Sequence, residues 1–309
     1  MKKNSLHDLY NPKYAAGYNE KFLTNPFSKS SSDRELELLQ GLITPDTKWL
    51  DAGCGTGYYL GHFPGIQRAG LDITPSMLEE AKKASPDALF FREGDFRNDI
   101  PEWHHEWSLI SCMWYPYSYL ESIGEFETML TNFIHWLKPG GDLFLPVADL
   151  YDLRPLVPHV PYNQYEEVTG GSIAITSYTW TWIQDNNEGT HVNMVAPHVD
   201  HVIQLLEPYF DTIEIARYPP FYDGWVSRRA IVAKGRRASV ITGQKANITW
   251  HPVPPSINGP YQTLDTLVDM VQVDTLGAAS HKQLFREIFS RIKSGRLLKS
   301  LGKKILGRS

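Results

Sequence analysis

The stretch that decides the fold is Asp51-Ala52-Gly53-Cys54-Gly55-Thr56-Gly57, which overlaps the end of the apolar run 48–52 and precedes a helical pattern. Glycines in such a turn adopt positive φ at little cost and let backbone approach a ligand closely, while the following helix offers unpaired N–H groups. Asp72 ends the next predicted strand, where a carboxylate can accept both hydroxyls of a ribose. A dinucleotide fingerprint requires glycine at position 58, where Tyr58 stands, so the spacing argues against a pyrophosphate ligand.

On both sides of this turn, short apolar runs alternate with helical patterns from residue 48 to residue 234. This alternation predicts an α/β fold, a doubly wound parallel sheet covered by helices on both faces. One helix begins near residue 74 and another covers residues 124–137. The sheet has seven predicted strands, of which the last two form a closing antiparallel pair: 48–52, 67–72, 88–92, 107–114, 142–147, 211–218 and 228–234.

The segment 148–196 is an insertion with a different pattern, rich in proline at its start. Alternation over 172–183 predicts one strand and 190–195 its return strand, so we expect a small antiparallel sheet that caps the main one. Three aromatic residues fall on one face of the predicted strand: Tyr178, Trp180 and Trp182. They form a stacking surface for a flat acceptor, or they are buried against the main sheet or a second subunit in a homodimer. We favour packing, because large aromatic side chains mostly supply contact area.

The charge of the 309-residue chain is distributed unevenly. Its net charge is −5, but segment 281–309 carries nine Lys or Arg and one acid, or +8, so the remaining 21 bases and 34 acids give −13. We therefore expect no nucleic-acid partner, because a general nucleic-acid binder carries positive charge on its folded surface. The basic segment predicts an amphipathic helix lying on an anionic membrane, with docking on the acidic body or on a partner, or disorder, as the alternatives.

Two further features bear on where the protein works. Cys54 and Cys112 are too few for a disulfide framework and indicate a reducing compartment. The first ten residues lack the apolar run of a signal peptide, and no stretch approaches the roughly 18 apolar residues of a spanning helix. We expect a cytoplasmic protein, peripheral on the inner membrane face where the basic segment binds lipid.

Four motifs, in the family's order, resemble those of class I S-adenosylmethionine-dependent methyltransferases. The glycine turn 51–57 resembles the first motif, and Gly70-Leu-Asp-Ile73 with Ser76-Met-Leu78 resembles the ribose-binding motif. Glu93-Gly-Asp-Phe96 resembles the third motif, and Leu137-Lys-Pro-Gly-Gly141 resembles the turn before the fifth strand. The resemblance implies a Rossmann-like fold and a three-part organisation: an N-terminal helical lid over 1–45, the methyltransferase domain over 46–235, and a linker with an amphipathic C-terminal helix over 236–309.

The same resemblance implies S-adenosylmethionine as the cofactor. Asp51 and the turn backbone would hold its methionine part, Asp72 its ribose and Asp95 its adenine amino group. Trp114 would line the space beside the sulfonium, and Tyr18 resembles a tyrosine that closes over the cofactor. The cofactor-binding residues that the resemblance implies are Tyr14, Asp51, Gly53, Cys54, Gly55, Gly57, Asp72, Ile73, Met77, Asp95, Phe96, Cys112 and Met113.

No catalytic residue is assigned from the sequence. Methyl transfer is an in-line displacement, and much of its acceleration comes from holding the nucleophile near the methyl group, so a base is needed only where the acceptor loses a proton early. The catalytic candidates are Tyr117, Tyr119, His191 and His198, with Tyr115 and Asp149 as further acceptor-side residues. Each has packing or hydrogen bonding as its simpler explanation. His198 and His201 lack a third ligand nearby, so we predict no metal site.

We predict methyl transfer to an O or N of a small molecule. A sugar or polysaccharide precursor is the candidate, because the insertion and Cys112-Met-Trp114 resemble sugar N,N-dimethyltransferases. Nucleic-acid methylation is disfavoured, because Met113-Trp-Tyr-Pro-Tyr117 stands where an Asn-Pro-Pro-Tyr type of motif is used, and because the body is acidic. The alternative is a catalytically silent S-adenosylmethionine-binding scaffold or regulatory protein.

Overall fold

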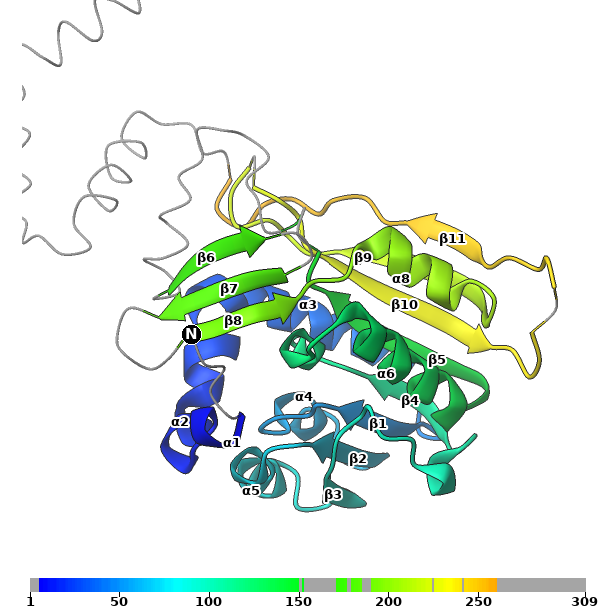
Figure 1. The fold of residues 1–309 in the computed structure, drawn as a ribbon, viewed down its shortest axis with the longest axis horizontal. Helices are drawn as coiled ribbons and strands as arrows, with labels where there is room; N and C mark the ends of the chain where they lie inside the picture. Colours follow the sequence, from blue (N-terminus) through cyan, green and yellow to red (C-terminus); the bar gives the residue numbers. More distant parts are fainter. Residues whose placement is uncertain are drawn as a thin grey trace, which may run out of the picture.

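The computed structural model describes residues 6–149, 152, 171–176, 179–184, 190–223, 225–240 and 242–259. Its centre is an eight-stranded sheet with the order β11-β9-β10-β5-β4-β1-β2-β3 (Figure 1). The strands from β3 to β5 are parallel, β10 is antiparallel to both of its neighbours, and β11 is parallel to β9. The bounds are β1 Lys48–Ala52, β2 Gln67–Asp72, β3 Phe90–Glu93, β4 Trp107–Ser111, β5 Leu137–Val147, β9 Phe210–Arg217, β10 Arg229–Arg236 and β11 Asn247–Trp250.

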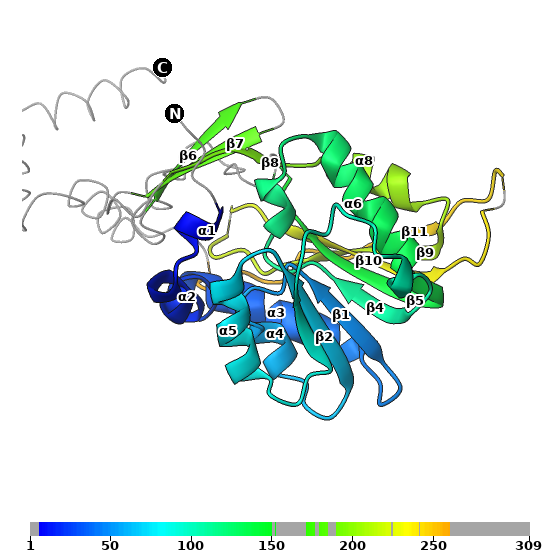
Figure 2. The same ribbon diagram turned by 60° about the horizontal axis from the view of Figure 1, so that its bottom comes forward.

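Helices cover both faces of this sheet (Figures 1 and 2). One layer contains α6 (Ile123–Trp136) and α8 (Val199–Leu206), and the other contains α3 (Pro26–Leu42), α4 (Tyr58–Gly61) and α5 (Pro75–Ala84). Neighbouring strand residues point into opposite layers: Leu50 of β1 packs into the core under α6, while Trp49 packs into the core under α3. The alternation confirms the predicted doubly wound fold, because a strand buried on both faces places successive side chains on opposite sides.

The predicted strands are all present, with shifted ends. The fourth strand stops at Ser111 rather than residue 114, because Trp114 and Tyr115 adopt left-handed backbone with φ of 58° and 60°. The fifth strand begins at Leu137, where it already pairs with Trp107, and therefore includes the Lys-Pro-Gly-Gly run predicted as a turn.

An eighth strand, β11, lies within the segment after residue 235, where the sequence predicts a linker. Strand β11 lies at the sheet edge, where Asn247 aligns with Thr212 of β9. Only four residues long and exposed throughout, it gives the sequence too short an alternation to recognise.

The insertion forms a second, three-stranded antiparallel sheet of β6 (Gly171–Thr176), β7 (Thr179–Gln184) and β8 (Thr190–Val195). The single strand predicted over 172–183 is therefore wrong: it is a hairpin whose ends, Thr176 and Thr179, are paired. The return strand 190–195 is confirmed. Strand β8 contacts the short 3-10 helix η3 (Pro116–Tyr119), which places this sheet beside the carboxyl end of β4. Tyr178 and the side chains of Trp180 and Trp182 lie outside the described residues, so their role stays a prediction.

The described part of the N-terminal region, residues 6–45, is largely helical. It contains α1 (Leu6–Leu9), α2 (Pro12–Tyr18), the π-helix η1 (Asn19–Leu23) and α3, with α2 packed against α5. Among the described residues, no helix combines the length and apolar character needed to cross a bilayer. Segment 281–309 lies outside the described residues, so its helical and membrane-bound state stays a prediction.

Candidate active site

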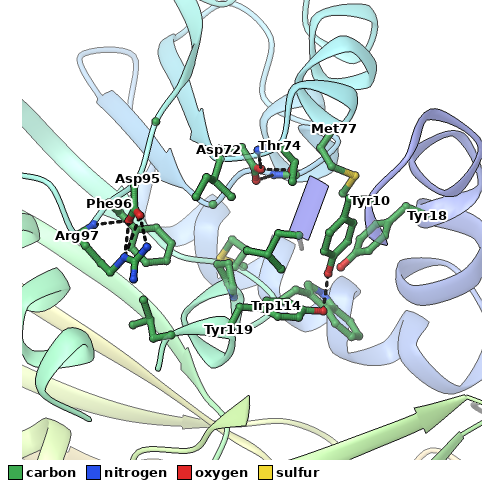
Figure 3. Close-up of a pocket in the computed structure, with 18 residues that line it drawn as sticks. Tyr10, Tyr18, Asp72, Thr74, Met77, Asp95, Phe96, Arg97, Trp114 and Tyr119 are labelled. Atoms are coloured by element: carbon green, nitrogen blue, oxygen red, sulfur yellow. Dashed lines mark hydrogen bonds and ion pairs between the residues drawn. The ribbon is translucent and has the colours of Figure 1, made fainter. Parts of the chain in front are cut away.

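A pocket lies at the carboxyl ends of the parallel strands, beside the N-terminal helices (Figure 3). This carboxyl edge is where α/β folds bind ligands. The wall includes a majority of the predicted cofactor residues: Gly53, Gly55, Asp72, Ile73, Met77, Asp95, Phe96 and Met113. The rest of the predicted set, Tyr14, Asp51, Cys54, Gly57 and Cys112, is not among the described residues of the wall.

The glycine turn presents bare backbone to the pocket. Gly53 has φ of +80°, and a Cβ at this position would lie 2.4 Å from Cγ of Pro116. Gly55 has φ of +53°, and its Cβ would lie 3.1 Å from Cε of Met77. A side chain at Gly53 is therefore disfavoured by conformation and by space, and one at Gly55 by conformation. Cys54 points the other way, into the space beside Gly70, which explains why its thiol is buried and does not reach the wall.

Asp72 is held in a fixed orientation on the pocket wall. Its Oδ2 accepts the Gly55 N–H at 2.8 Å, and its Oδ1 accepts the Thr74 N–H at 2.9 Å and the Thr74 hydroxyl. Burial raises the pKa of Asp72, and these hydrogen bonds oppose that shift. The carboxylate predicted to bind a ribose is therefore oriented by the glycine turn and by the start of α5.

Asp95 also lies on the wall, but its carboxylate is already paired with Arg97, a residue that the sequence analysis did not single out. The guanidinium of Arg97 donates to both carboxylate oxygens, with Nε–Oδ1 at 3.0 Å and Nε–Oδ2 at 2.9 Å, and reaches Oε1 of Glu125 at 2.8 Å. Burial alone would raise the pKa of Asp95, but the Arg97 contacts outweigh it and hold the pKa below its usual value. The predicted contact of Asp95 with an adenine amino group therefore competes with Arg97, itself a wall residue.

Asp51 lies in the layer beneath the turn. Its Oδ1 accepts the Ser111 hydroxyl at 2.6 Å, and Ser111 in turn accepts from the indole of Trp49 at 2.8 Å. Within the described part of the chain, Oδ2 of Asp51 has no hydrogen-bond partner. Burial raises the pKa of Asp51 to about 7. Asp51 thus supplies a buried acceptor under the glycine turn rather than a direct wall contact, and Cys112 is equally buried.

The turn after β4 forms a strained aromatic wall. Trp114 and Tyr115 are consecutive non-glycine residues in the left-handed region, an arrangement that costs energy and persists only where surrounding contacts fix it. The indole of Trp114 donates to the hydroxyl of Tyr59, which donates to Glu35. Arg228 stacks on the Trp114 ring at 5.6 Å and donates to the Tyr115 hydroxyl at 3.3 Å.

Glu35 of α3 is the buried centre of this network. It accepts hydrogen bonds from Tyr59 and, at 2.8 Å, from the hydroxyl of Tyr218. Burial raises the pKa of Glu35 to about 7, although both hydroxyls and the charge of Arg228 act against the shift. Sequence reasoning missed Glu35, because its partner Tyr218 is 183 residues away in the chain.

Tyrosine side chains cover the other side of the pocket. The hydroxyls of Tyr10 and Tyr119 are 2.6 Å apart (Figure 3). Outside the lining, the Tyr14 ring packs edge-on to Tyr10 at 5.3 Å. Tyr10 and Tyr18 are wall residues. Tyr14 is not in the described lining, whereas Tyr10, just before α2, is.

Among the catalytic candidates, Tyr119 lies on the wall. Tyr117 is fully buried, where its hydroxyl donates to the Pro146 carbonyl and accepts from the Ala148 N–H, both at 2.8 Å. His198 caps α8 by accepting from the Asp200 N–H at 3.2 Å. Asp149 is buried against Arg229 at 2.9 Å. These three are not wall residues in the described pocket, and the side chain of His191 lies outside the described residues.

Comparison with known proteins supports the resemblance to class I S-adenosylmethionine-dependent methyltransferases over part of the chain. Residues 50–141 match the family model for a methyltransferase domain. The PH0226 protein of Pyrococcus horikoshii OT3, a solved structure, covers 72% of this chain and 99% of its own at 18% identity, with a TM-score of 0.50. At that identity, this likeness concerns the fold alone.

Two curated relatives are similar over part of their length. The dTDP-3-amino-3,4,6-trideoxy-alpha-D-glucopyranose N,N-dimethyltransferase of Streptomyces venezuelae is 34% identical over 101 residues, which is 32% of this chain and 41% of that protein. The trans-aconitate 2-methyltransferase of Escherichia coli O1:K1 / APEC is 30% identical over 138 residues, which is 40% of this chain and 54% of that protein. The chain therefore spans about half the length of these relatives or less.

Proposed function

We propose that this protein transfers a methyl group from S-adenosylmethionine to a nitrogen or oxygen of a small polar molecule, with sugars as the favoured class. The observation that carries the proposal is the convergence of the bare glycine turn and two carboxylates, Asp72 and Asp95, on one pocket wall. A ribose needs hydroxyl acceptors, and a sulfonium with an ammonium group favours a negatively charged site.

The residues present fit this cofactor. Gly53 and Gly55 leave a backbone cradle that a Cβ would fill. Beneath it, Asp51 holds a buried carboxylate oxygen that lacks a partner among the described residues and so favours a cationic group above the turn. Asp72 faces the pocket with its oxygens already oriented.

The cofactor, when bound, supplies a methyl group activated by its sulfonium. The protein's own task is then to bind, orient and exclude water. Asp72 would hold the ribose hydroxyls, and the Gly53–Gly55 backbone would hold the amino-acid part. Tyr10 and Tyr18 form the cover from the N-terminal helices, and the hydrogen-bonded pair of Tyr10 and Tyr119 joins that cover to η3.

Tyr119, on η3 beside this cover, would position the acceptor rather than act as a base. Burial raises the pKa of its phenol, so it stays protonated near neutral pH and can donate a hydrogen bond to an acceptor hydroxyl or amine. A neutral amine attacks through its lone pair and loses a proton only after the transfer, which agrees with a wall that offers aromatic rings rather than an imidazole among its described residues.

The charges of the wall support a sugar over a polycarboxylate. Recognition of several carboxylates favours Arg or Lys free to form paired hydrogen bonds. Among the described wall residues the cation is Arg97, and its guanidinium already contacts Asp95 and Glu125. The aromatic rings of Trp114 and Tyr119 supply flat apolar surface beside it, which suits an uncharged or amino sugar better than a tricarboxylic acid such as trans-aconitate.

Two measurements on the full chain test the proposal. Calorimetry with S-adenosylmethionine and S-adenosylhomocysteine should show one site for each, and Glu79→Gln on the exposed face of α5 should bind equally. Labelled methyl should then appear on uncharged or amino sugars and not on trans-aconitate. Absence of cofactor binding would overturn the proposal, binding without label in any acceptor or cell extract would favour the silent scaffold, and label on carboxylates would refute the sugar class.

We also retain two proposals that rest on sequence alone. Segment 281–309, with its +8 charge and apolar stripe, would bind an anionic membrane, and the insertion would support a homodimer. Vesicle flotation of the full chain and of a chain ending near Leu276 tests the first, since equal flotation of both would contradict it. Light scattering tests the second.

A further inference from the structure

Three potential metal ligands meet at the surface, and none of them is in the described lining of the pocket. Asp99 and His104 lie in the connection from β3 to β4, and His135 lies in the last turn of α6. Their ligand atoms are all within 4.8 Å of one another, and all three residues are exposed. The cluster therefore combines two imidazoles and a carboxylate from segments about 30 residues apart in the chain.

The backbone brings His104 to His135. The turn residue His105 has φ of 59°, and its N–H donates to the His135 carbonyl at 2.9 Å. The next N–H, of Glu106, donates to the Trp136 carbonyl at 2.9 Å. These bonds dock the β3–β4 connection on the end of α6, and they leave the His104 and His135 rings with centroids 5.6 Å apart.

A buried base supports the cluster. Trp103 and Trp136 are buried and pack edge-to-face at 5.1 Å directly beneath the two ligand-bearing segments. The indole N–H of Trp136 donates to Oδ1 of Asp99 at 3.2 Å. A hydrogen bond from a fixed donor to a ligating carboxylate is the outer contact that metal sites use to orient their ligands.

The arrangement of Asp99 and His104 is one that a metal ion can enter. Nε2 of His104 lies 2.8 Å from Oδ1 and 2.9 Å from Oδ2 of Asp99, so a nitrogen ligand and a carboxylate ligand already lie side by side.

We infer that Asp99, His104 and His135 form a binding site for a divalent transition-metal ion of the zinc type. Imidazole nitrogen with one carboxylate is a ligand set suited to Zn²⁺, whereas Mg²⁺ and Ca²⁺ prefer oxygen ligands. Water completes the coordination at this exposed position. The ion would clamp the β3–β4 connection to α6, and the site is independent of the proposed methyl transfer.

The simpler explanation is a surface ion pair between Asp99 and His104, in which His135 is a bystander. The two explanations differ at His135. Removal of His135 leaves the Asp99–His104 hydrogen bonds intact but takes away one of three ligands. His201 provides a matched control, since its Nε2 lies 2.9 Å from Oε1 of Glu127 in an exposed pair that belongs to no described three-ligand cluster.

The test is calorimetric titration of the chelator-treated full chain with ZnCl₂ alone. One Zn²⁺ should bind, MgCl₂ should give no heat above dilution, and His135→Ala and Asp99→Asn should each weaken Zn²⁺ binding at least 10-fold, while His201→Ala binds like the wild type. Zn²⁺ at about 100 times the wild-type Kd should raise the unfolding Tm by roughly 5–10 °C in the wild type and by about half of that or less in His135→Ala.

Folding of the variants is checked without metal, where all should unfold at the wild-type Tm because the replaced side chains are exposed. A wild-type chain that binds no Zn²⁺, or a His135→Ala chain that binds it as tightly as the wild type, would overturn the inference. Equal weakening in His201→Ala would also overturn it, because the ion would then bind scattered surface histidines.

Discussion

The two edges of the main sheet are built from the same strands but carry opposite chemistry. At the carboxyl edge, Asp51 and Asp72 are buried, and the turn after β4 is held in left-handed backbone. At the amino edge, charged groups such as Lys48 and Glu106 form exposed pairs in front of β1 and β4. The buried edge holds strained backbone and buried carboxylates, whereas solvent screens the charges at the exposed edge.

This difference suggests how the fold separates function from stability. Trp114, which lines the pocket, has an unfavourable left-handed backbone that its surroundings hold in place. Its indole donates to Tyr59, which donates to Glu35. Exposed pairs can be lost with little effect, because surface ion pairs contribute about 0–1 kcal/mol. Comparing a substitution at the carboxyl edge with a matched one at the amino edge therefore separates effects on ligand binding from effects on stability.

The largest expected effect is that of Gly53→Ala, compared with Gly65→Ala before β2. Both glycines have strongly positive φ, +80° and +85°, so both variants suffer the conformational cost of a side chain. At Gly65 nothing lies within 4 Å of the new Cβ, whereas at Gly53 it meets Pro116 at 2.4 Å. We expect a loss of unfolding free energy of about 1–2 kcal/mol for Gly65→Ala and about 3–5 kcal/mol for Gly53→Ala.

Urea unfolding of both variants, with calorimetry of cofactor binding, measures this difference. Gly65→Ala should bind S-adenosylmethionine as the wild type does, and Gly53→Ala should lose most of its affinity. Equal destabilisation of the two variants would show that Pro116 moves away at no cost and that the edges do not differ in packing.

The parts of this edge that the sequence predicts are the local ones. The glycine turn and Asp72 are recognisable because strand, turn and acid follow one another in fixed order, and structure places them on the wall. The sequence predicts Tyr14 as a cofactor residue, but Tyr10 and not Tyr14 is in the described lining. The path of the chain between α1 and α2 decides which tyrosine faces the pocket, and the spacing of residues in the sequence does not reveal that path.

The parts that sequence does not predict depend on tertiary approach. Glu35 meets Tyr218 only because α3 packs across the sheet, and Arg97 meets Glu125 only because α6 begins beside β3. The hairpin of β6 and β7 was predicted as one strand because a two-residue connection leaves the alternation uninterrupted. In each case the contact or the turn depends on segments that the fold brings together, and the local sequence pattern does not show them.

A second, smaller effect concerns the pH dependence of stability. The pKa of Glu35 is about 7 in the folded protein, against about 4.5 when exposed in the unfolded chain. The folded state therefore holds a proton that the unfolded state releases, so the stabilisation is complete below pH 4.5 and is lost as pH rises through 7. Glu35→Gln mimics the protonated group and should be as stable as the wild type at pH 5 but more stable by about 2–3 kcal/mol at pH 8.

Unfolding free energies from pH 5 to pH 8 check this sign. The exposed Glu106→Gln at the amino edge is the control and should run parallel to the wild type. A residual slope should remain in Glu35→Gln, because burial also raises the pKa of Asp51 to about 7. Parallel curves for Glu35→Gln and the wild type would show that the carboxylate of Glu35 is ionised throughout and that Arg228 compensates its burial.

The smallest effect expected at the carboxyl edge is that of Asp72→Asn on cofactor affinity. An amide keeps one acceptor oxygen but turns its NH₂ toward either the Gly55 or the Thr74 N–H, so one donor of the turn loses its partner. We expect S-adenosylmethionine to bind roughly 10–50-fold more weakly, about 1.5–2.5 kcal/mol, while Glu106→Gln leaves the affinity unchanged. Because the ribose hydroxyls bind the carboxylate, adenosine alone should show the same ratio between wild type and variant as the full cofactor. A ratio near one for adenosine would place the contribution of Asp72 in the shape of the glycine turn and not in contact with the ribose.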